Sequence, residues 1–271
     1  MDTTTKNSFS GSSIPFKYEE YLGPLLFESY AMDLAKRVKE TSPSNILEIA
    51  CGTGRLTNQL LKEIPNAQIT ATDINSAMLN VAKDIVKDQK NITWEIADAM
   101  SLPFNDEHFD CVTAQFGVMF YPDKIKAHKE ALRVLKKGGT YIFNSWNKME
   151  ENRFIHLVKE LMEEYFPADP PSFYNLPFSY FEPAIISAEL EEAGFQYIKT
   201  SLVKVNGYSK DAKSAAIGLL EGTPIYASII EKDETLLPEI INNLSGKLAD
   251  LYGKDNLSVP LQAIVTTAKK K

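Results

Sequence analysis

The chain has 271 residues, 44% of them hydrophobic and 24% charged, which is enough for one large domain with a substantial buried core. Its net charge of -7 argues against nucleic acid as the main partner, because a duplex-binding protein needs a basic surface to release counterions. We expect no membrane span and no signal peptide, since no apolar run is long enough and the N-terminus lacks the required pattern.

The N-terminal part predicts an arm, an aromatic segment and a helix. Residues 1–13 are rich in Ser, Thr and Asn, which predicts a disordered arm. Residues 14–24 are dense in aromatic side chains, and two interpretations stay open: a lid over a pocket, or a strap that only packs on the fold. From Glu28 to Thr41 the apolar residues recur at helical spacing, so we expect an amphipathic helix there.

A glycine-containing turn follows the first predicted strand. Residues 45–49 are largely aliphatic and predict a buried strand, and residues 56–63 predict a helix. Glycines in such a turn let a ligand approach the backbone closely. The dinucleotide fingerprint requires a third glycine, but that position is Thr57, so the fingerprint fails. What remains is an acidic residue, a small residue and two glycines at every second position: Glu48, Ala50, Gly52 and Gly54.

Strands and helices continue to alternate after this turn. Further strands are predicted at residues 68–74, 92–96, 109–116 and 140–146. The helix after the second strand begins near Ser76, a candidate N-cap. A helix at 122–136 is expected to stop at Gly138 and Gly139. The alternation predicts an α/β fold with a parallel sheet that helices cover on both faces.

The second half of the sequence has less regular patterns. Residues 147–182 are crowded with aromatic residues and prolines, and a connection of this length is often functional. The remaining elements are expected to be a helix at 183–194, a strand at 195–205, helices at 209–220 and 234–252, and a strand at 259–269.

Polar residues follow the ends of successive predicted strands. Asp73 ends the second strand, Asp98 follows the third, and Gln115 ends the fourth. Ligands of doubly wound sheets bind beyond the carboxyl ends of the strands, so these residues should share one site with the two glycines. A carboxylate at the tip of the second strand can accept hydrogen bonds from two ribose hydroxyls.

The sequence resembles the class I S-adenosylmethionine-dependent methyltransferases, in the small-molecule branch that includes quinone-biosynthesis enzymes. The resemblance covers residues 14–146 well, with its strongest local matches at 98–104 and 131–139. It implies a doubly wound, mostly parallel sheet of seven strands, with helices on both faces and the last strand antiparallel beside the sixth. We expect a single domain over residues 14–271, with cap or substrate segments at about 14–40, 147–182 and 210–255.

The resemblance also implies the cofactor S-adenosyl-L-methionine, which leaves as S-adenosylhomocysteine. The residues that it places at the cofactor are Glu48, Ala50, Gly52 and Gly54 at the methionine end, Asp73 at the ribose, Ile74 and Met78 beside the adenine, Asp98 and Ala99 at the adenine amino group, Gln115 next to the sulfonium, and Tyr18 in a segment that closes over it.

Methyl transfer from a sulfonium is an in-line displacement, in which the protein mainly positions and desolvates the reactants. We expect a small acceptor that is aromatic or apolar. A base is needed only for a protonated acceptor, and the candidate catalytic residues are His156 and Tyr121. By its helical spacing His128 should be packed in the core, and His108 should be exposed in a polar turn.

Two other functions stay open, a nicotinamide-dependent oxidoreductase and a non-catalytic nucleoside-binding module on the same fold. The missing third glycine and the extra acid Asp98 count against the oxidoreductase. Cys51 and Cys111 fit neither a metal spacing nor a disulfide framework, so we expect small buried residues in a reducing cytoplasm. The three histidines form no metal-binding pair, and we predict no metal.

Overall fold

The structure is a computed structural model that describes residues 14–87 and 89–271. These residues form two compact units. The sheet unit comprises Tyr30–Asn147, Pro177–Val203 and Ala263–Lys271. The helical unit comprises the described residues up to Ser29, Lys148–Leu176 and Lys204–Gln262. The predicted disordered arm falls on residues 1–13, outside the described residues.

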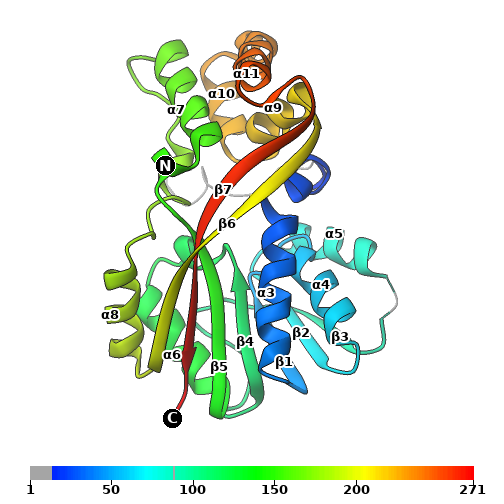
Figure 1. The fold of residues 1–271 in the computed structure, drawn as a ribbon, viewed down its shortest axis with the longest axis vertical. Coiled ribbons are helices and arrows are strands. Elements are labelled where there is room, and N and C mark those ends of the chain that lie inside the picture. The colour runs from blue at the N-terminus through cyan, green and yellow to red at the C-terminus, as the bar shows by residue number, and fades with distance from the viewer. Residues whose placement is uncertain (1–13, 88) are drawn as a thin grey trace. The chain divides into compact units, whose positions relative to one another are not determined.

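A seven-stranded sheet forms the core of the sheet unit (Figure 1). Its strands are β1 (Asn45–Ile49), β2 (Gln68–Asp73), β3 (Ile92–Ile96), β4 (Phe109–Gln115), β5 (Leu135–Trp146), β6 (Gln196–Asp211) and β7 (Asp255–Lys269). The order is β3-β2-β1-β4-β5-β7-β6; β1 to β5 pair in parallel and β7 pairs antiparallel with β5. This confirms the predicted α/β fold, in which the last strand lies beside the sixth.

Helices cover both faces of this sheet. α3 (Glu28–Glu40), α4 (Arg55–Glu63) and α5 (Ser76–Val86) pack on one face. Leu34 and Val38 of α3 are fully buried in one cluster with Ile46 of β1 and Ile69 of β2, because apolar residues at helical spacing form one stripe. The last eleven residues of the predicted 14–40 cap segment therefore belong to the sheet unit.

The other face carries α6 (Lys124–Val134) and α8 (Pro183–Ala193), which pack against each other (Figure 1). His128 of α6 is fully buried and stacks on Phe143 of β5, with ring centroids 5.6 Å apart. Burial lowers the pKa of His128 to about 4, so its ring is neutral at pH 7. This confirms His128 as a packed core residue.

The predicted helix stop at Gly138 and Gly139 is wrong. α6 ends at Val134 and β5 begins directly at Leu135. The two glycines lie in the irregular first part of β5, where Gly138 has a φ of +77° and the register against β4 shifts. Gly138 N donates to Lys270 O and Lys270 N donates to Gly139 O, both at 3.0 Å. These bonds to the end of the chain extend the strand, and no local pattern could show them.

The helical unit contains more helix than its sequence patterns predict. Residues 14–27 form α2 (Ile14–Lys17) and the π-helix η1 (Tyr18–Phe27), and the stretch predicted as irregular contains α7 (Arg153–Tyr165). The region 210–255 holds α9 (Ala212–Glu221), α10 (Ile225–Asp233) and α11 (Leu237–Tyr252), of which α10 has no predicted counterpart. Short 3-10 turns are η2 (Val118–Phe120) in the sheet unit, and η3 (Met149–Glu151), η4 (Phe173–Asn175) and η5 (Glu234–Leu236). No helix in the described ranges is both long and apolar enough to cross a membrane.

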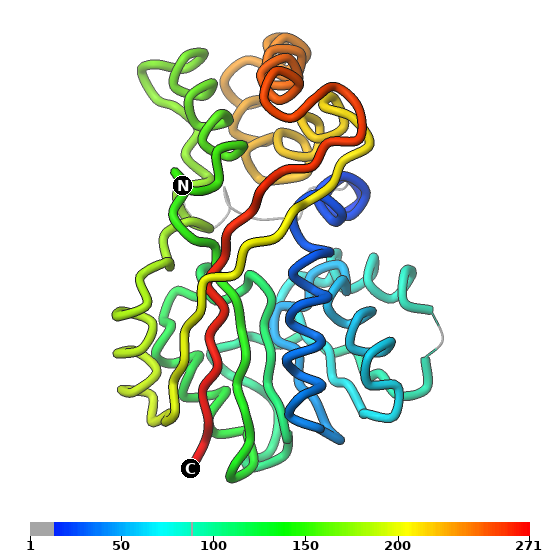
Figure 2. The backbone as a smooth tube through the Cα atoms, in the orientation of Figure 1, coloured from blue at the N-terminus to red at the C-terminus, as the bar shows by residue number. Residues whose placement is uncertain are grey.

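Two glycines allow η1 to pack closely within the helical unit. A Cβ added to Gly207 of β6 would lie 1.7 Å from the carbonyl oxygen of Leu25, and one added to Gly218 of α9 would lie 2.7 Å from Cβ of Tyr21. Any larger residue at Gly207 would have to displace the backbone of η1. Figure 2 follows β6 and β7, the long neighbouring strands whose residues are shared between the two units.

Candidate functional site

The loops after β1, β2 and β3 meet at one edge of the sheet, because these strands are parallel neighbours. Backbone hydrogen bonds tie the loops together at the end of β2. Cys51 N donates to Thr72 O at 2.9 Å, and Ala97 N donates to Asp73 O at 3.2 Å. The predicted convergence of these strand ends is therefore present in the sheet unit.

Asp73 is the polar centre of this edge and is only 8% exposed. Its Oδ2 accepts from Gly52 N and its Oδ1 accepts from Asn75 N, both at 2.8 Å. Burial raises the pKa of the Asp73 carboxyl, although the backbone donors of Asn75, Gly52 and Ile74 act in the opposite direction. A carboxylate has about four lone-pair sites, so beside these backbone donors Asp73 can still accept from a ligand hydroxyl. The neighbouring cap differs from the prediction: Asn75, not Ser76, caps α5 by accepting from Ala77 N at 2.9 Å.

The turn after β1 uses backbone conformations that favour glycine. Ala50, Gly52 and Gly54 have φ values of +54°, +57° and +82°. A Cβ on Gly54 would lie 3.1 Å from Cβ of Ala82, so glycine lets the start of α4 approach α5. A Cβ on Gly52 would lie 3.9 Å from Cε of Met78, which places the end of the Met78 side chain next to the turn. The turn therefore exposes its backbone at the two glycines, and the Met78 side chain ends beside it.

Gly117, which follows β4, makes room for Ala50. A Cβ on Gly117 would lie 2.6 Å from Cβ of Ala50 and 3.3 Å from the hydroxyl oxygen of Tyr121. Tyr121 is buried, and among the described residues its hydroxyl has no hydrogen-bond partner. Burial raises the pKa of Tyr121, and electrostatic interactions with Tyr141, Asp73 and Asp98 raise it further. The hydroxyl therefore stays protonated at pH 7 and is available as a donor.

Asp98 begins a tight turn after β3. Its Oδ1 accepts from Met100 N at 2.8 Å and its carbonyl oxygen accepts from Ser101 N at 2.9 Å. Ala99, inside the turn, is 8% exposed, whereas Ile74 after β2 is 69% exposed. The edge thus combines an acceptor with an exposed apolar side chain, which suits a flat ring that carries a donor group.

Glu48 lies inside the core beneath the turn and has no exposed surface. The Thr57 hydroxyl donates to Glu48 Oε2 at 2.6 Å, and in the described part of the chain Oε1 has no partner. Burial raises the pKa of Glu48 from 4.5 to about 8, which outweighs the opposing hydrogen bond from Thr57. Glu48 is therefore mostly neutral at pH 7, and it acts on the turn from within the core.

This shift gives a pH-dependent stability with a defined sign. Above pH 4.5 the unfolded chain ionises Glu48 while the folded chain keeps its proton up to about pH 8. The free energy of unfolding therefore falls with rising pH in this window, by up to about 1.4 kcal/mol per pH unit. We expect Glu48→Gln to unfold at higher urea concentration than the wild type at pH 8, with a smaller difference at pH 5.

The matched control is Glu63→Gln, on an exposed carboxyl that pairs with Lys39 at 2.9 Å. The Lys39 ammonium lowers the pKa of Glu63, so its stabilising effect is present at higher pH and is lost as the pH falls. A Glu48→Gln advantage that did not grow between pH 5 and pH 8 would contradict a buried neutral Glu48.

Two predicted site residues lie in the helical unit. Tyr18 of η1 stacks on Phe27 with ring centroids 4.9 Å apart. His156 of α7 accepts at Nδ1 from Arg153 Nη1, 2.8 Å away, and Glu160 Oε1 lies 3.8 Å from the same nitrogen. A neutral ring with Nδ1 as acceptor carries its hydrogen on Nε2. His156 can therefore accept a proton only after its Nδ1 leaves Arg153.

The other predicted site residues all belong to the sheet unit. They are Glu48, Ala50, Gly52, Gly54, Asp73, Ile74, Met78, Asp98, Ala99, Gln115 and Tyr121. Gln115 is half-buried at the end of β4. In the described ranges no three His, Cys, Asp or Glu side chains gather as metal ligands would.

Sequence reasoning missed the support for the loop after β4. Phe116, with a φ of +52°, donates its backbone N–H to Oδ1 of the fully buried Asn144 at 2.8 Å. Asn144 lies on β5 directly after Phe143, and a polar residue inside an otherwise largely apolar stretch was the available signal. The neighbouring Gly117 gave no comparable signal, because its role depends on contact with Ala50.

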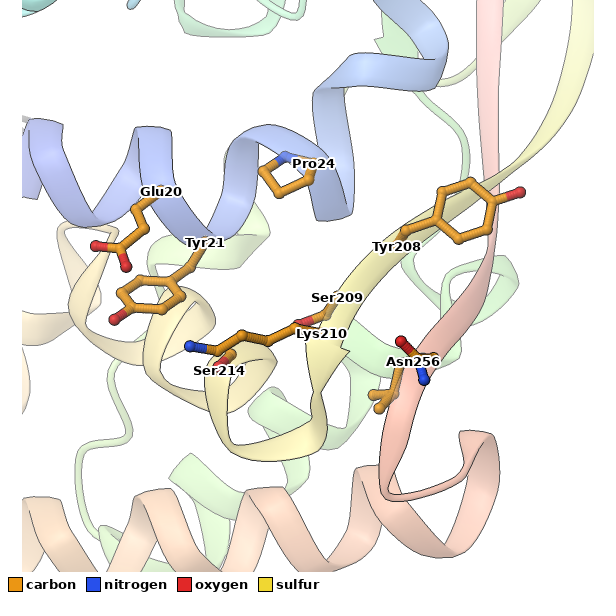
Figure 3. Close-up of a pocket in the computed structure, with 9 residues that line it drawn as sticks. Glu20, Tyr21, Pro24, Tyr208, Ser209, Lys210, Ser214 and Asn256 are labelled. Atoms are coloured by element: carbon orange, nitrogen blue, oxygen red, sulfur yellow. The ribbon is translucent and has the colours of Figure 1, made fainter.

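The helical unit contains a cleft of about 340 Å³ (Figure 3). Glu20 and Tyr21 of η1, Lys210 of β6 and Ser214 of α9 are among the residues that line it. Figure 3 shows the Lys210 side chain extending toward Tyr21. Burial and the Glu20 carboxylate raise the pKa of Tyr21, so its phenol is protonated at pH 7. The cleft therefore combines a phenol with the carboxyl group of Glu20 and the amino group of Lys210.

Comparison with known families matches residues 26–167 to the ubiE/COQ5 methyltransferase family. The chain is also similar to the ubiquinone/menaquinone biosynthesis C-methyltransferase UbiE of Pseudomonas aeruginosa, with 40% identity over 115 residues. That match covers 41% of this chain and 45% of the relative. The chain thus matches the curated relatives over less than half of their length.

Solved structures share the fold at low sequence identity. Phosphoethanolamine N-methyltransferase 2 of Haemonchus contortus, solved with S-adenosylhomocysteine, superposes with a TM-score of 0.61 at 18% identity, covering 97% of this chain and 59% of that one. The 4+2 cyclase SpnF superposes with a TM-score of 0.58 at 18% identity, covering 96% of this chain and 93% of that one. These likenesses show the fold alone, and the comparisons support neither the oxidoreductase nor the non-catalytic alternative.

Proposed function

This chain belongs to the ubiE/COQ5 methyltransferase family, and on that premise we propose that it transfers a methyl group from S-adenosylmethionine to a small aromatic or apolar acceptor. The observation that carries the proposal is the arrangement around Asp73. Its carboxylate is tied to Gly52 in the turn after β1, and the residue after β3 is tied to its carbonyl oxygen. One nucleoside can therefore reach all three loops.

The test is binding followed by turnover. S-adenosylhomocysteine is expected to raise the thermal unfolding midpoint, because a ligand that binds only the folded state stabilises it, whereas NAD is expected to leave it unchanged. Incubation with S-adenosylmethionine and an acceptor should then give a product heavier by one methyl group. Stabilisation by NAD and not by S-adenosylhomocysteine would reject the proposal.

The predicted contacts fit the groups that the sheet unit presents. Asp73 would accept from both ribose hydroxyls, and Ile74 and Met78 would lie beside the adenine. Asp98 and the amide of Ala99 would take the adenine amino edge. At the other end of the cofactor, the residues proposed to shape and line the site are Glu48, Ala50, Gly52, Gly54 and Gln115.

The bound cofactor would supply an electrophilic methyl carbon on a sulfonium, an excellent leaving group. The chain's own part is then to align the acceptor and to exclude water. The Tyr121 hydroxyl, buried and protonated beside Asp73 and Asp98, serves as a donor in this arrangement rather than as a base. His156 remains the predicted base, which its contact with Arg153 allows only after a change of partner.

Tyr121→Phe is expected to stabilise the ligand-free protein and to weaken its binding of the cofactor. An unpartnered buried hydroxyl destabilises the fold, so its removal is expected to raise the free energy of unfolding of the ligand-free protein by about 1 kcal/mol. The same change removes a donor from the site, so the rise in unfolding midpoint caused by S-adenosylhomocysteine should shrink. Calorimetric scans with and without ligand measure both effects.

Tyr141→Phe is the matched control, because Tyr141 is a buried tyrosine of β5 that packs against Phe195, with ring centroids 5.5 Å apart. It should leave the ligand-induced shift intact. An unchanged shift in Tyr121→Phe would remove Tyr121 from the proposed site.

The acceptor is the least constrained part of the proposal. The UbiE relatives are named C-methyltransferases, which makes a carbon atom the first acceptor to test. The family match ends at residue 167, before the segment 204–262 of the helical unit, so acceptor choice is proposed to depend on this unit. Its cleft at Tyr21 and Lys210 offers groups for a polar aromatic ligand, and Tyr18 is proposed to act in a closing segment. The net charge of -7 favours a small molecule over nucleic acid, and the two buried free cysteines suit the cytoplasm.

A further inference from the structure

The loop that carries Asp98 needs support from elsewhere in the sheet unit. It runs from residue 97 to residue 108, and its only described regular pairing is the isolated bridge between Asp98 and Ser101. A loop without a helix or strand orders its side chains only when other contacts fix its backbone. The position of the Asp98 carboxylate therefore depends on what holds this loop.

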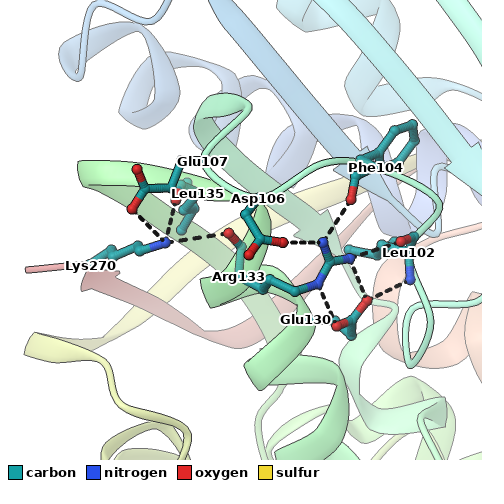
Figure 4. A network of polar contacts seen from close by, with 8 residues as sticks. All are labelled: Leu102, Phe104, Asp106, Glu107, Glu130, Arg133, Leu135 and Lys270. Atoms are coloured by element: carbon teal, nitrogen blue, oxygen red, sulfur yellow. Dashed lines mark hydrogen bonds and ion pairs between the residues drawn. The ribbon is translucent and has the colours of Figure 1, made fainter.

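Arg133, near the end of α6, holds the loop through hydrogen bonds from its guanidinium group (Figure 4). Its Nη2 donates to Leu102 O at 2.8 Å and its Nη1 donates to Phe104 O at 2.7 Å. Its other donors reach Asp106 Oδ1 and both carboxylate oxygens of Glu130, all at 2.8 Å. All five N–H groups are thus bound within the protein, and Arg133 has no donor left for a ligand.

Glu130 completes the clamp from the same helix. Its Oε2 accepts from Leu102 N at 2.8 Å, so both backbone polar groups of Leu102 are held by α6. Leu102 directly follows Ser101, the last residue of the Asp98 turn. The fork of an arginine can make these parallel bonds, and the single ammonium of a lysine cannot.

The bonds from Arg133 and Glu130 to the loop backbone fix the loop more than the ion pair between Arg133 and Asp106 does. The Asp106 side chain is 73% exposed, and exposed pairs contribute little. Farther along the loop, Lys270 Nζ donates to Leu135 O at 2.8 Å and lies 3.6 Å from Glu107 Oε1 (Figure 4). The end of the loop is therefore also fastened beside the end of α6.

We propose that Arg133 and Glu130 are positioning residues that set the Asp98 carboxylate against the adenine amino group of the cofactor. The inference rests on the proposed function. Its consequence is that the preference for adenine over a purine without the amino group depends on Arg133, a side chain that makes no ligand contact of its own.

The experiment is calorimetric titration of the full chain with two ligands, S-adenosylhomocysteine and its analogue with purine in place of adenine. The wild type is expected to prefer the adenine ligand by about tenfold or more, as for a hydrogen bond to a charged acceptor. Arg133→Met should lower this preference below about threefold, while affinity for the purine analogue changes less. Arg133→Lys should lose most of the preference too, and Arg133→Met in an Asp98→Ala background should cause no further loss.

Arg37→Met is the matched control. Arg37 of α3 pairs with Asp33 at 2.7 Å and is 33% exposed, against 30% for Arg133. It should keep the wild-type preference. Circular dichroism checks that each variant is folded, and if Arg133→Met is not, Arg133→Lys and Glu130→Gln carry the test.

The outcomes separate the two proposals. A wild type that does not bind S-adenosylhomocysteine overturns the proposed function itself. A wild type that prefers adenine, together with folded Arg133 variants that keep this preference within twofold, overturns only the role of Arg133. Equal weakening of both ligands also overturns it, because a general structural defect would not distinguish them.

Discussion

Asp73→Ala is expected to weaken binding of S-adenosylhomocysteine by roughly 100-fold or more, while the sheet unit stays folded. The proposed ribose contact consists of two hydrogen bonds to a charged acceptor, each contributing about 1.5 kcal/mol or more, and together they account for a factor of this size. The change also removes the bonds from Gly52 N and Asn75 N, which adds to the loss by loosening the turn. Titration calorimetry gives the affinity, and circular dichroism reports the fold.

Asp110→Ala is a close control for Asp73→Ala. Asp110 Oδ2 also accepts two backbone N–H groups, from Ser44 at 3.0 Å and Asn45 at 2.8 Å, but these residues lie at the start of β1 rather than at its end. This variant should lose stability and keep its affinity. Wild-type affinity in a folded Asp73→Ala protein would refute the ribose role.

Gly117→Ala is expected to lower S-adenosylhomocysteine affinity by about tenfold and the free energy of unfolding by about 2 kcal/mol. Its new Cβ would lie 2.6 Å from Cβ of Ala50, so one of the two loops must move, and overpacking of this kind typically costs about 1–3 kcal/mol. Ala50 has little freedom to yield, because its φ of +54° is already unfavourable for a residue with a side chain.

The double variant Ala50→Gly with Gly117→Ala should restore both properties to near the wild-type values. It moves the single methyl group from one loop to the other, and glycine suits the left-handed conformation at position 50. Ala50→Gly alone measures the effect of the missing methyl, which completes a double-mutant cycle. Additive losses in that cycle would show that the two positions do not share one space.

The sequence of α7 contains a helical pattern of apolar residues, but other features of the same segment favoured an irregular structure. Phe154, Val158 and Leu161 recur at helical spacing and are buried, but the surrounding prolines and aromatic residues favoured an irregular segment. The π-helix η1 is a different case, because Gly207 and its close approach to Leu25 depend on β6, far along the chain. The two compact units likewise combine segments that are distant in sequence.

The sequence by itself determined the alternation of strands and helices in the sheet unit, the parallel pairing of its first five strands, and the gathering of Asp73, Asp98 and the glycine turn at one edge, while the antiparallel last strand was implied by the family resemblance. Local periodicity fixes each strand, and parallel neighbours necessarily bring their carboxyl ends together. Only the tertiary structure decided that Gly117 makes room for Ala50, and that Arg133 holds the loop of Asp98. Those roles come from distances between residues far apart in the chain, and such contacts leave no periodic signal in the sequence.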